Sequence, residues 1–251
     1  MRQTVMIPCL VSALVLGIGA AAATSAVSKD SPVPAYVSGA LSDKSRTKAD
    51  TDQDALRKPG EMLVYAGIKP GSVVAEYIPG AGYFTKIFGK AVGPNGHLYT
   101  LAQTMTPALT AIQNDPTYGG KVTILAGDLT TIKPPVPVDV VWTSRNYHDL
   151  SKDVRNKLNQ VAFSELKPGG IYIVLDHAAV PGSGDYAMAQ RPALHRIDEN
   201  LVKLEVMHAG FKLTSENNTL RNPKDDHLTA VFDKSVRGDT DQFILKFTKP
   251  K

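Results

Sequence analysis

The sequence is nearly free of cysteine. Its one cysteine among 251 residues, Cys9, lies in an apolar N-terminal stretch that we expect to be removed as a secretion signal. The mature chain would then hold no thiol, which excludes disulfide bonds, thiolate zinc sites and cysteine nucleophiles. A chain without thiols is consistent with an oxidising compartment.

An excess of charge of one sign is also missing. The formal net charge is +4, and the densest basic cluster, at residues 44–58, is interrupted by Asp50, Asp52 and Asp54. This mixture predicts a solvated helix face and not a surface for nucleic acid. We therefore expect no nucleic-acid partner.

Long apolar runs are absent beyond the N-terminus. Residues 5–23 form such a run behind Arg2, and small residues at positions 20–26 suit cleavage by a signal peptidase. An uncleaved anchor is the alternative, because about 19 apolar residues just suffice to span a bilayer. Pro8 and Ser12 favour cleavage. We expect a signal peptide at residues 1–26, export to the bacterial periplasm and no stable membrane insertion afterwards.

What the sequence does contain is a regular alternation of two patterns. Short apolar runs alternate with segments of helical periodicity; the runs lie at residues 72–76, 97–101, 122–126, 138–143 and 171–175 and the helical segments at residues 83–92, 106–114, 151–166 and 197–209. This order predicts an α/β fold, a three-layer, doubly wound, mostly parallel Rossmann-like sheet. Residues 242–248 alternate with period two, which predicts an antiparallel strand near the sheet edge.

The loop after the first predicted strand is the place to look for a ligand. In such sheets, ligands bind beyond the carboxyl ends of the strands. Gly80 and Gly82 allow close approach of the backbone, and the following helix offers free N–H groups to a polar ligand. Glu76 stands at the strand end, where its carboxylate can order the loop. A plain tight turn explains the two glycines equally well.

The order of several short segments narrows this interpretation. Residues 76–83, 127–129, 139–149, 166–175 and 209–213 resemble, in the expected order, the motifs of class I S-adenosylmethionine-dependent methyltransferases. Residues 57–61, 79–85, 146–149 and 237–247 resemble more narrowly an exported bacterial family of predicted methyltransferases. The resemblance covers roughly residues 56–250.

The resemblance implies a cofactor, a reaction and a division of the chain. The cofactor is S-adenosyl-L-methionine, and we expect a small-molecule substrate as the methyl acceptor. Residues 57–251 would form the methyltransferase-like domain, behind an N-terminal extension with a helix at residues 27–56. The donor would be held by residues from the matching segments: Glu76, Pro79, Gly80, Ala81, Gly82, Tyr83, Gln103, Asp128, Leu129 and Asn146.

Two departures from the family pattern leave a second function open. Ile78 replaces the first glycine of the motif, and Gln103 stands near the position of the acidic residue that grips the ribose. Charge-assisted hydrogen bonds are about twice as strong as neutral ones. The alternative is therefore a catalytically degenerate periplasmic binding protein that keeps the scaffold.

Acid–base candidates follow two strands that should be neighbours. His148 and Asp149 follow the fourth strand, and Asp176 and His177 follow the fifth. We predict His148, Asp149 and Asp176 as the catalytic residues, with His148 as a base. The same residue types also permit a metal-assisted enzyme, but their spacing is not diagnostic and we assign no metal site.

Three further features have more ordinary interpretations. Trp142 lies inside the fourth strand, which predicts a core residue. The Gly/Pro-rich residues 181–196 suit an insertion that covers the substrate, in which Arg191, His195 and Arg196 could meet an anionic group, and a plain helix surface explains these side chains equally well. Asp225, Asp226 and His227 are expected in a solvated turn.

Overall fold

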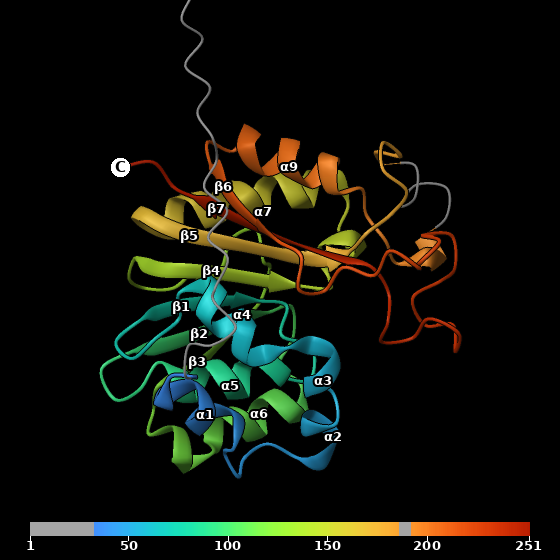
Figure 1. Ribbon diagram of the computed structural model, residues 1–251. Helices are drawn as coiled ribbons and strands as arrows, with labels where there is room; N and C mark the ends of the chain where they lie inside the picture. Colours follow the sequence, from blue (N-terminus) through green and yellow to red (C-terminus); the bar gives the residue numbers. More distant parts are fainter. Residues whose placement is uncertain (1–32, 186–191) are drawn as a thin grey trace, which may run out of the picture. The chain divides into compact units, whose positions relative to one another are not determined.

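A seven-stranded sheet organises the chain. The computed structural model describes residues 33–185 and 192–251, so the predicted signal and Arg191 lie outside the described residues. The strands are β1 (Val73–Tyr77), β2 (His97–Ala102), β3 (Val122–Ala126), β4 (Val138–Ser144), β5 (Leu166–His177), β6 (Lys212–Asn217) and β7 (Gln242–Thr248). Their spatial order is β3-β2-β1-β4-β5-β7-β6, as Figure 1 shows.

Pairing in the sheet is parallel except around β7. The four pairs among β1 to β5 are parallel, and β7 runs antiparallel to both β5 and β6. The predicted antiparallel strand is confirmed. It lies second from the edge, because the exposed and polar strand β6 covers its outer side.

Helices cover both faces of the sheet. One face carries α1 (Ala35–Leu41), α4 (Pro59–Ala66), α5 (Tyr83–Ala91) and α6 (Pro107–Asn114); the other carries α7 (Lys152–Glu165) and α9 (Glu199–His208) (Figure 1). Neighbouring residues of a strand belong to different core clusters: Val74 packs with the first group of helices and Ala75 with the second. Side chains alternate across a strand, so the predicted three-layer fold is confirmed.

Local sequence signals fix several helix ends. Pro59 opens α4, and Gly67 ends it with a φ of 73°. The side chains of Thr106 and Ser151 cap α6 and α7 by accepting backbone N–H groups. Trp142 is fully buried between Phe84 and Phe88, with ring centroids 4.9 and 5.3 Å away, which confirms it as a core residue.

Two segments differ from the simple pattern. Residues 167–170 form a bulge inside β5, where the register against β4 jumps from Leu166 to Ile171. The charged residues 42–56 hold two one-turn helices, α2 (Lys48–Thr51) and α3 (Asp54–Arg57), with the side chain of Thr47 capping α2. Helix α1 packs on α4 and α5.

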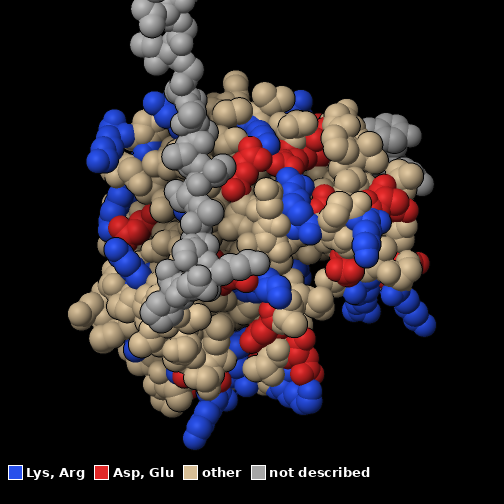
Figure 2. Space-filling model, in the orientation of Figure 1, with Lys and Arg blue, Asp and Glu red and all other residues tan. Residues whose placement is uncertain are grey.

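The surface mixes charges of both signs. Figure 2 shows lysine and arginine side chains interspersed with aspartate and glutamate on the visible face. Within the described ranges, no helix has the length and apolar character that crossing a membrane requires.

Two helical glycines should respond to alanine in opposite directions. A Cβ on Gly89 in α5 would lie 2.7 Å from a methyl of Val122 and 3.0 Å from the ring of Tyr118. We expect Gly89→Ala to lower the free energy of unfolding by about 1–3 kcal/mol through overpacking. Gly39→Ala in α1 meets no atom within 4 Å and should raise it by up to about 1 kcal/mol. Urea denaturation measures both; changes of equal sign would contradict this packing.

Candidate functional site

The register of the parallel strands brings five loops to one edge of the sheet. Tyr77 pairs with both Leu101 and Thr143, and Ser144 pairs with Leu175. The residues that follow these strand ends are therefore neighbours: Ile78 after β1, Gln103 after β2, Gly127 after β3, Arg145 after β4 and Asp176 at the end of β5. The predicted donor and acid–base residues thus share one edge.

The β1 loop (residues 78–82) leaves open backbone at this edge. Gly80 has a φ of 58°, and a Cβ placed on it would meet no atom within 4 Å beyond its chain neighbours. Gly82, with a φ of 85°, begins α5, and a Cβ there would overlap the side chain of Ile112. Gly80 is therefore exposed backbone that faces open space, which we call the Gly80 hollow, while Gly82 allows the loop to pack.

Ile78 takes the left-handed conformation that the motif normally gives to glycine. Its φ is 55°, which costs a β-branched residue about 1–3 kcal/mol. The surrounding backbone holds it there: its N–H donates to the carbonyl of Leu101 at 2.9 Å, and its carbonyl accepts from Nδ2 of Asn146 at 3.0 Å. The side chain packs toward the core between the sheet and α7 and α9.

Asn146 ties the β1 loop to the β4 loop (residues 145–149). Its Nδ2 also donates to the carbonyls of Tyr77 at 3.3 Å and Ser144 at 3.0 Å, and its Oδ1 accepts the hydroxyl of Thr143 at 2.5 Å. The side chain is therefore committed to the protein. Any part that Asn146 plays in donor binding would run through the loop that it positions.

Glu76, at the end of β1, fixes the start of α5 behind the same loop by hydrogen bonds. The carboxyl group is buried, and the hydroxyls of Thr85 and Thr100 donate to its Oε2 at 2.6 and 3.4 Å. Burial raises the pKa of Glu76 to about 7, although both hydrogen bonds oppose the shift. Because Thr85 belongs to α5, Glu76 fixes the start of that helix under the Gly80 hollow.

The other predicted donor residues divide into exposed and buried groups. Pro79 is partly exposed, whereas Ala81, Gln103 and Asp128 are exposed and Leu129 is buried. Asp128 orders its own turn by accepting the backbone and the hydroxyl of Thr130 at 2.9 and 2.8 Å.

Tyr83 faces away from the open loop. Its hydroxyl donates to Asp54 at 2.6 Å, and the guanidinium of Arg57 lies 4.4 Å from its ring centroid. Arg46 holds the other oxygen of Asp54 at 2.9 Å. Tyr83 therefore fastens α5 to the N-terminal segment, and its ring is covered by arginine.

Arg57 and Arg145 are cations without an acidic partner. Among residues 33–185 and 192–251, no carboxylate forms an ion pair with either, and Nε of Arg57 is buried with no hydrogen-bond partner. Arg145 donates from Nε to the neutral amide of Gln242 at 2.8 Å, with its backbone at a φ of 57°. Burial and then the charge of Arg57 lower the pKa of Arg145 to about 9.

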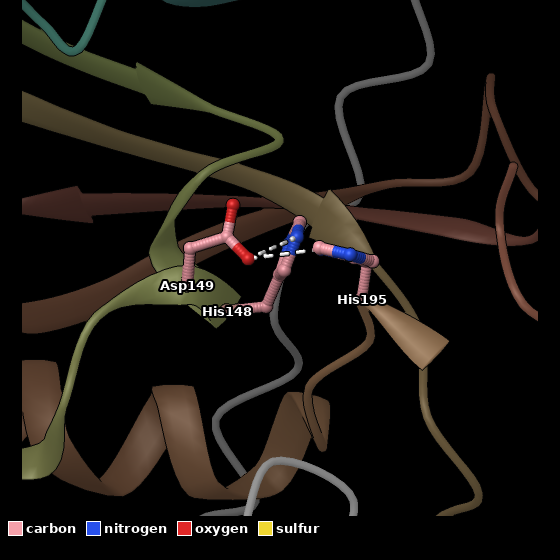
Figure 3. A group of neighbouring side chains, drawn as sticks. All are labelled: His148, Asp149 and His195. Carbon is pink, nitrogen blue, oxygen red and sulfur yellow. Dashed lines mark hydrogen bonds and ion pairs between the residues drawn. The ribbon is translucent and has the colours of Figure 1, made fainter. Parts of the chain in front are cut away.

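A cluster of histidines and carboxylates lies beside this loop, at the ends of β4 and β5. Nδ1 of His148 lies 2.7 Å from the fully buried Asp176, which also accepts the His148 backbone N–H at 2.9 Å. Nε2 of His148 lies 3.3 Å from Asp149, and Nδ1 of His195 lies 2.9 Å from the same carboxylate oxygen (Figure 3). The structure thus joins the three predicted catalytic residues and adds His195.

Electrostatics give His148 and His177 opposite protonation states. Burial alone would lower the pKa of His148, but Asp176 and Asp149 raise it to about 10. Burial lowers the pKa of His177 to about 3, and its Nδ1 lies 2.7 Å from the Thr240 hydroxyl. At neutral pH His148 therefore carries a proton on both ring nitrogens and His177 is neutral.

Two of the remaining candidates are bound into the protein. Arg196 is buried against Asp225, with guanidinium nitrogens 2.7 and 2.9 Å from its carboxylate oxygens. His227 contacts Asp241 at 3.0 Å. Arg196 is therefore not available to an anionic substrate, and the turn at residues 225–227 anchors the segment that carries His195.

The architecture defines the fold class. The strand order, the antiparallel β7 and the open loop after β1 form the fold of class I S-adenosylmethionine-dependent methyltransferases, so the resemblance predicted from the sequence is confirmed for the fold. No protein-family model matches the chain.

Particular proteins share parts of this architecture. The protein-L-isoaspartate O-methyltransferase of Ignicoccus hospitalis is 28% identical over 115 residues, covering 45% of this chain and 51% of that protein. The chain thus matches about half the length of this curated relative.

Solved structures agree in fold at lower identity. The Burkholderia thailandensis 1,6-didemethyltoxoflavin-N1-methyltransferase, solved with S-adenosylhomocysteine bound, superposes with a TM-score of 0.57 at 16% identity, covering 81% of this chain and 82% of that one. The cyclase SpnF superposes with a TM-score of 0.60 at 16% identity, covering 82% and 85%.

Two site residues have surroundings that the sequence does not reveal: Arg145, and His195, which the sequence predicts only as a possible contact for an anionic group. Arg145 stands in a matching segment, but only its buried position and the lack of an acidic partner single it out. His195 lies 46 residues after Asp149, and its contact depends on how the insertion folds back. No local motif signals either residue.

The buried carboxyl of Glu76 should make stability depend on pH. Its pKa is about 7 in the folded protein, against 4.5 for the exposed group. The contribution of protonated Glu76 to the free energy of unfolding is complete below pH 4.5. It is lost as the pH rises through the folded-state pKa of about 7. We expect the wild-type free energy of unfolding to fall across this interval, by up to about 3 kcal/mol from Glu76.

Glu76→Gln tests this assignment because glutamine cannot ionise. The variant should lose that part of the pH slope in denaturant titrations between pH 4.5 and 8. Glu61→Gln, on the surface of α4, is the matched control and should keep the wild-type slope. An unchanged slope in Glu76→Gln would show that Glu76 ionises normally.

Proposed function

We propose that this protein is an S-adenosylmethionine-dependent methyltransferase acting on a small-molecule acceptor. The observation that carries the proposal is the Gly80 hollow at the strand ends of a methyltransferase fold. The bound S-adenosylhomocysteine of one structural neighbour and the methyltransferase relative support the choice of donor.

The residues around the hollow fit such a donor. Helix α5 has no side-chain cap, so its first N–H groups are available to a carboxylate. Exposed Gln103 offers neutral hydrogen bonds to the ribose, and Asp128 and Leu129 offer a carboxylate and an apolar contact to the adenine. No acidic residue stands at the ribose position, so binding of the ribose hydroxyls would depend on neutral hydrogen bonds, which are weaker than charge-assisted ones.

The protein's part in the reaction is mainly alignment. The bound donor supplies an electrophilic methyl group on a sulfonium, and transfer requires an acceptor atom held in line with it. The proton on His148 makes this side chain a hydrogen-bond donor and not a base in the protein without ligands. The predicted proton removal by His148 stays a prediction. Acceptors that arrive with a free electron pair need no base.

Two departures favour a second candidate, a binding protein that keeps the scaffold. Ile78 is strained and Gln103 is neutral, so both observations point to weaker donor affinity. A fold alone does not fix a reaction, and the neighbour SpnF is described as a cyclase. Loss of donor binding with retention of acceptor binding would distinguish this candidate.

Blocking the hollow tests the donor site. Gly80→Arg places a long cationic side chain in the open space, so calorimetry should show S-adenosylhomocysteine binding to wild type and at least tenfold weaker binding to the variant. Gly71→Arg is a matched control, because Gly71 also has positive φ and no atom within 4 Å, and lies before β1 at its other end.

The outcomes separate clearly. Normal binding by Gly71→Arg together with weak binding by Gly80→Arg supports the hollow as the donor site. Equal affinity of the two variants, or no heat from wild type at millimolar ligand, would contradict the proposal.

The unpaired arginines support an acceptor that carries a carboxylate or another anionic group. Burial lowers the pKa of both arginines, and the charge of Arg57 lowers the pKa of Arg145 further, so an anion bound beside Arg145 would offset this repulsion. Arg145 directly follows β4 at the edge that carries the donor hollow.

An acceptor screen with labelled donor tests this preference. Methyl transfer to small carboxylic acids should exceed transfer to the matched amides. Arg145→Met should raise KM for the acids at least tenfold. Arg145→Lys keeps the positive charge and should raise KM less than Arg145→Met does. Donor affinity should stay unchanged. Equal transfer to acids and amides would contradict an anionic acceptor.

A further inference from the structure

We propose that His148, Asp149 and His195 form a binding site for a divalent transition-metal ion such as Zn²⁺, Mn²⁺ or Co²⁺. Each residue offers one ligand atom, and these atoms all lie within 4.8 Å of one another (Figure 3). Two imidazoles and one carboxylate are a ligand set that such ions accept. The site goes beyond the proposed methyl transfer and does not depend on it.

The distances are close to those of a metal centre. The shared oxygen of Asp149 lies 3.3 Å from Nε2 of His148 and 2.9 Å from Nδ1 of His195. Ligand bonds of about 2.1 Å place neighbouring ligand atoms about 3.0–3.4 Å apart. An ion could therefore bind with small side-chain movements, and the proton on Nε2 of His148 would be released to solvent as the ion takes its place.

The partner on the far side of His148 is typical of a metal ligand. Asp176 holds Nδ1 at 2.7 Å and the backbone N–H of the same residue at 2.9 Å, so the ring is fixed with Nε2 toward Asp149. Ligating histidines commonly give their second nitrogen to a carboxylate in this way. Asp176 is fully buried and orients the ligand without contacting the ion.

His195 is presented by a segment that is itself anchored. Its backbone has a φ of 53°, the next residue is Arg196 in the buried pair with Asp225, and its ring packs edge-on against Phe232 at 4.9 Å. Holding a non-glycine residue in this conformation costs free energy, which structures tolerate mainly where a side chain has to be aimed.

The arrangement leaves room for further ligands. The side chain of His148 is 4% exposed, whereas those of His195 and Asp149 are 32% and 55% exposed. Metal sites with three protein ligands and one accessible side also bind water or a substrate atom at the open position. Asn146 connects the loop that carries His148 and Asp149 to the β1 loop. The ion would therefore lie at the same sheet edge as Gly80, beside the loop after β4.

Cobalt binding to the full chain tests the site without any assay of methyl transfer. Titration with Co²⁺ should give visible d–d absorption that saturates at one ion per chain, and Zn²⁺ should displace it. Asp149→Asn and His195→Ala should each weaken binding at least tenfold. Their folding is checked by circular dichroism, and the exposed Asp149 is the less disruptive position.

A matched control excludes binding to any histidine–aspartate pair. His227 contacts Asp241 at 3.0 Å, but within residues 33–185 and 192–251 it belongs to no group of three possible metal ligands, so His227→Ala should bind cobalt as wild type does. Absence of cobalt absorption in wild type, or equal affinity of wild type and His195→Ala, would overturn the proposal. Loss of S-adenosylhomocysteine binding alone would leave it standing.

Discussion

The hydrogen bonds of the Asn146 amide hold the functional edge of this protein together. They join the loop after β1 to the loop after β4 and keep Ile78 in a conformation that its side chain disfavours. The open backbone at Gly80, the position of Arg145 and the direction of His148 all follow from these two loops. A short polar side chain between neighbouring strand ends therefore determines the geometry of both the open loop after β1 and the histidine cluster.

Buried charge is distributed around this edge in two different ways. The pair of Arg155 with Glu205 joins α7 to α9, and the pair of Arg196 with Asp225 joins two surface segments. Buried ion pairs contribute little net stability, but removing one partner is costly, so they enforce a unique arrangement. Arg57 and Arg145 instead have no acidic partner among the described residues, and Asp149 is half exposed. The two arginines lie where an anionic acceptor is proposed to bind, and the exposed Asp149, between His148 and His195, lies where a metal ion is proposed to bind.

The sequence predicts the sheet well because its signals are local. Apolar runs, Pro59, Gly67 and the caps at Thr106 and Ser151 act within a few residues, and they place strands and helices closely. The bulge in β5 and the position of β7 inside β6 depend on pairing between distant segments, so periodicity does not reveal them. The histidine cluster was only partly predictable: strand order brings His148 to Asp176, whereas His195 arrives through an insertion. Likewise, Tyr83 turned toward Asp54 because the N-terminal segment packs on α5, which no motif encodes.

A crystal structure of the protein with S-adenosylhomocysteine tests the central claim most directly. The account predicts nucleoside density in the space over Gly80, with the ribose near Gln103 and the adenine near Asp128 and Leu129. Density for the ligand at any other place, or a hollow closed by the side chain of Ile78, would contradict it.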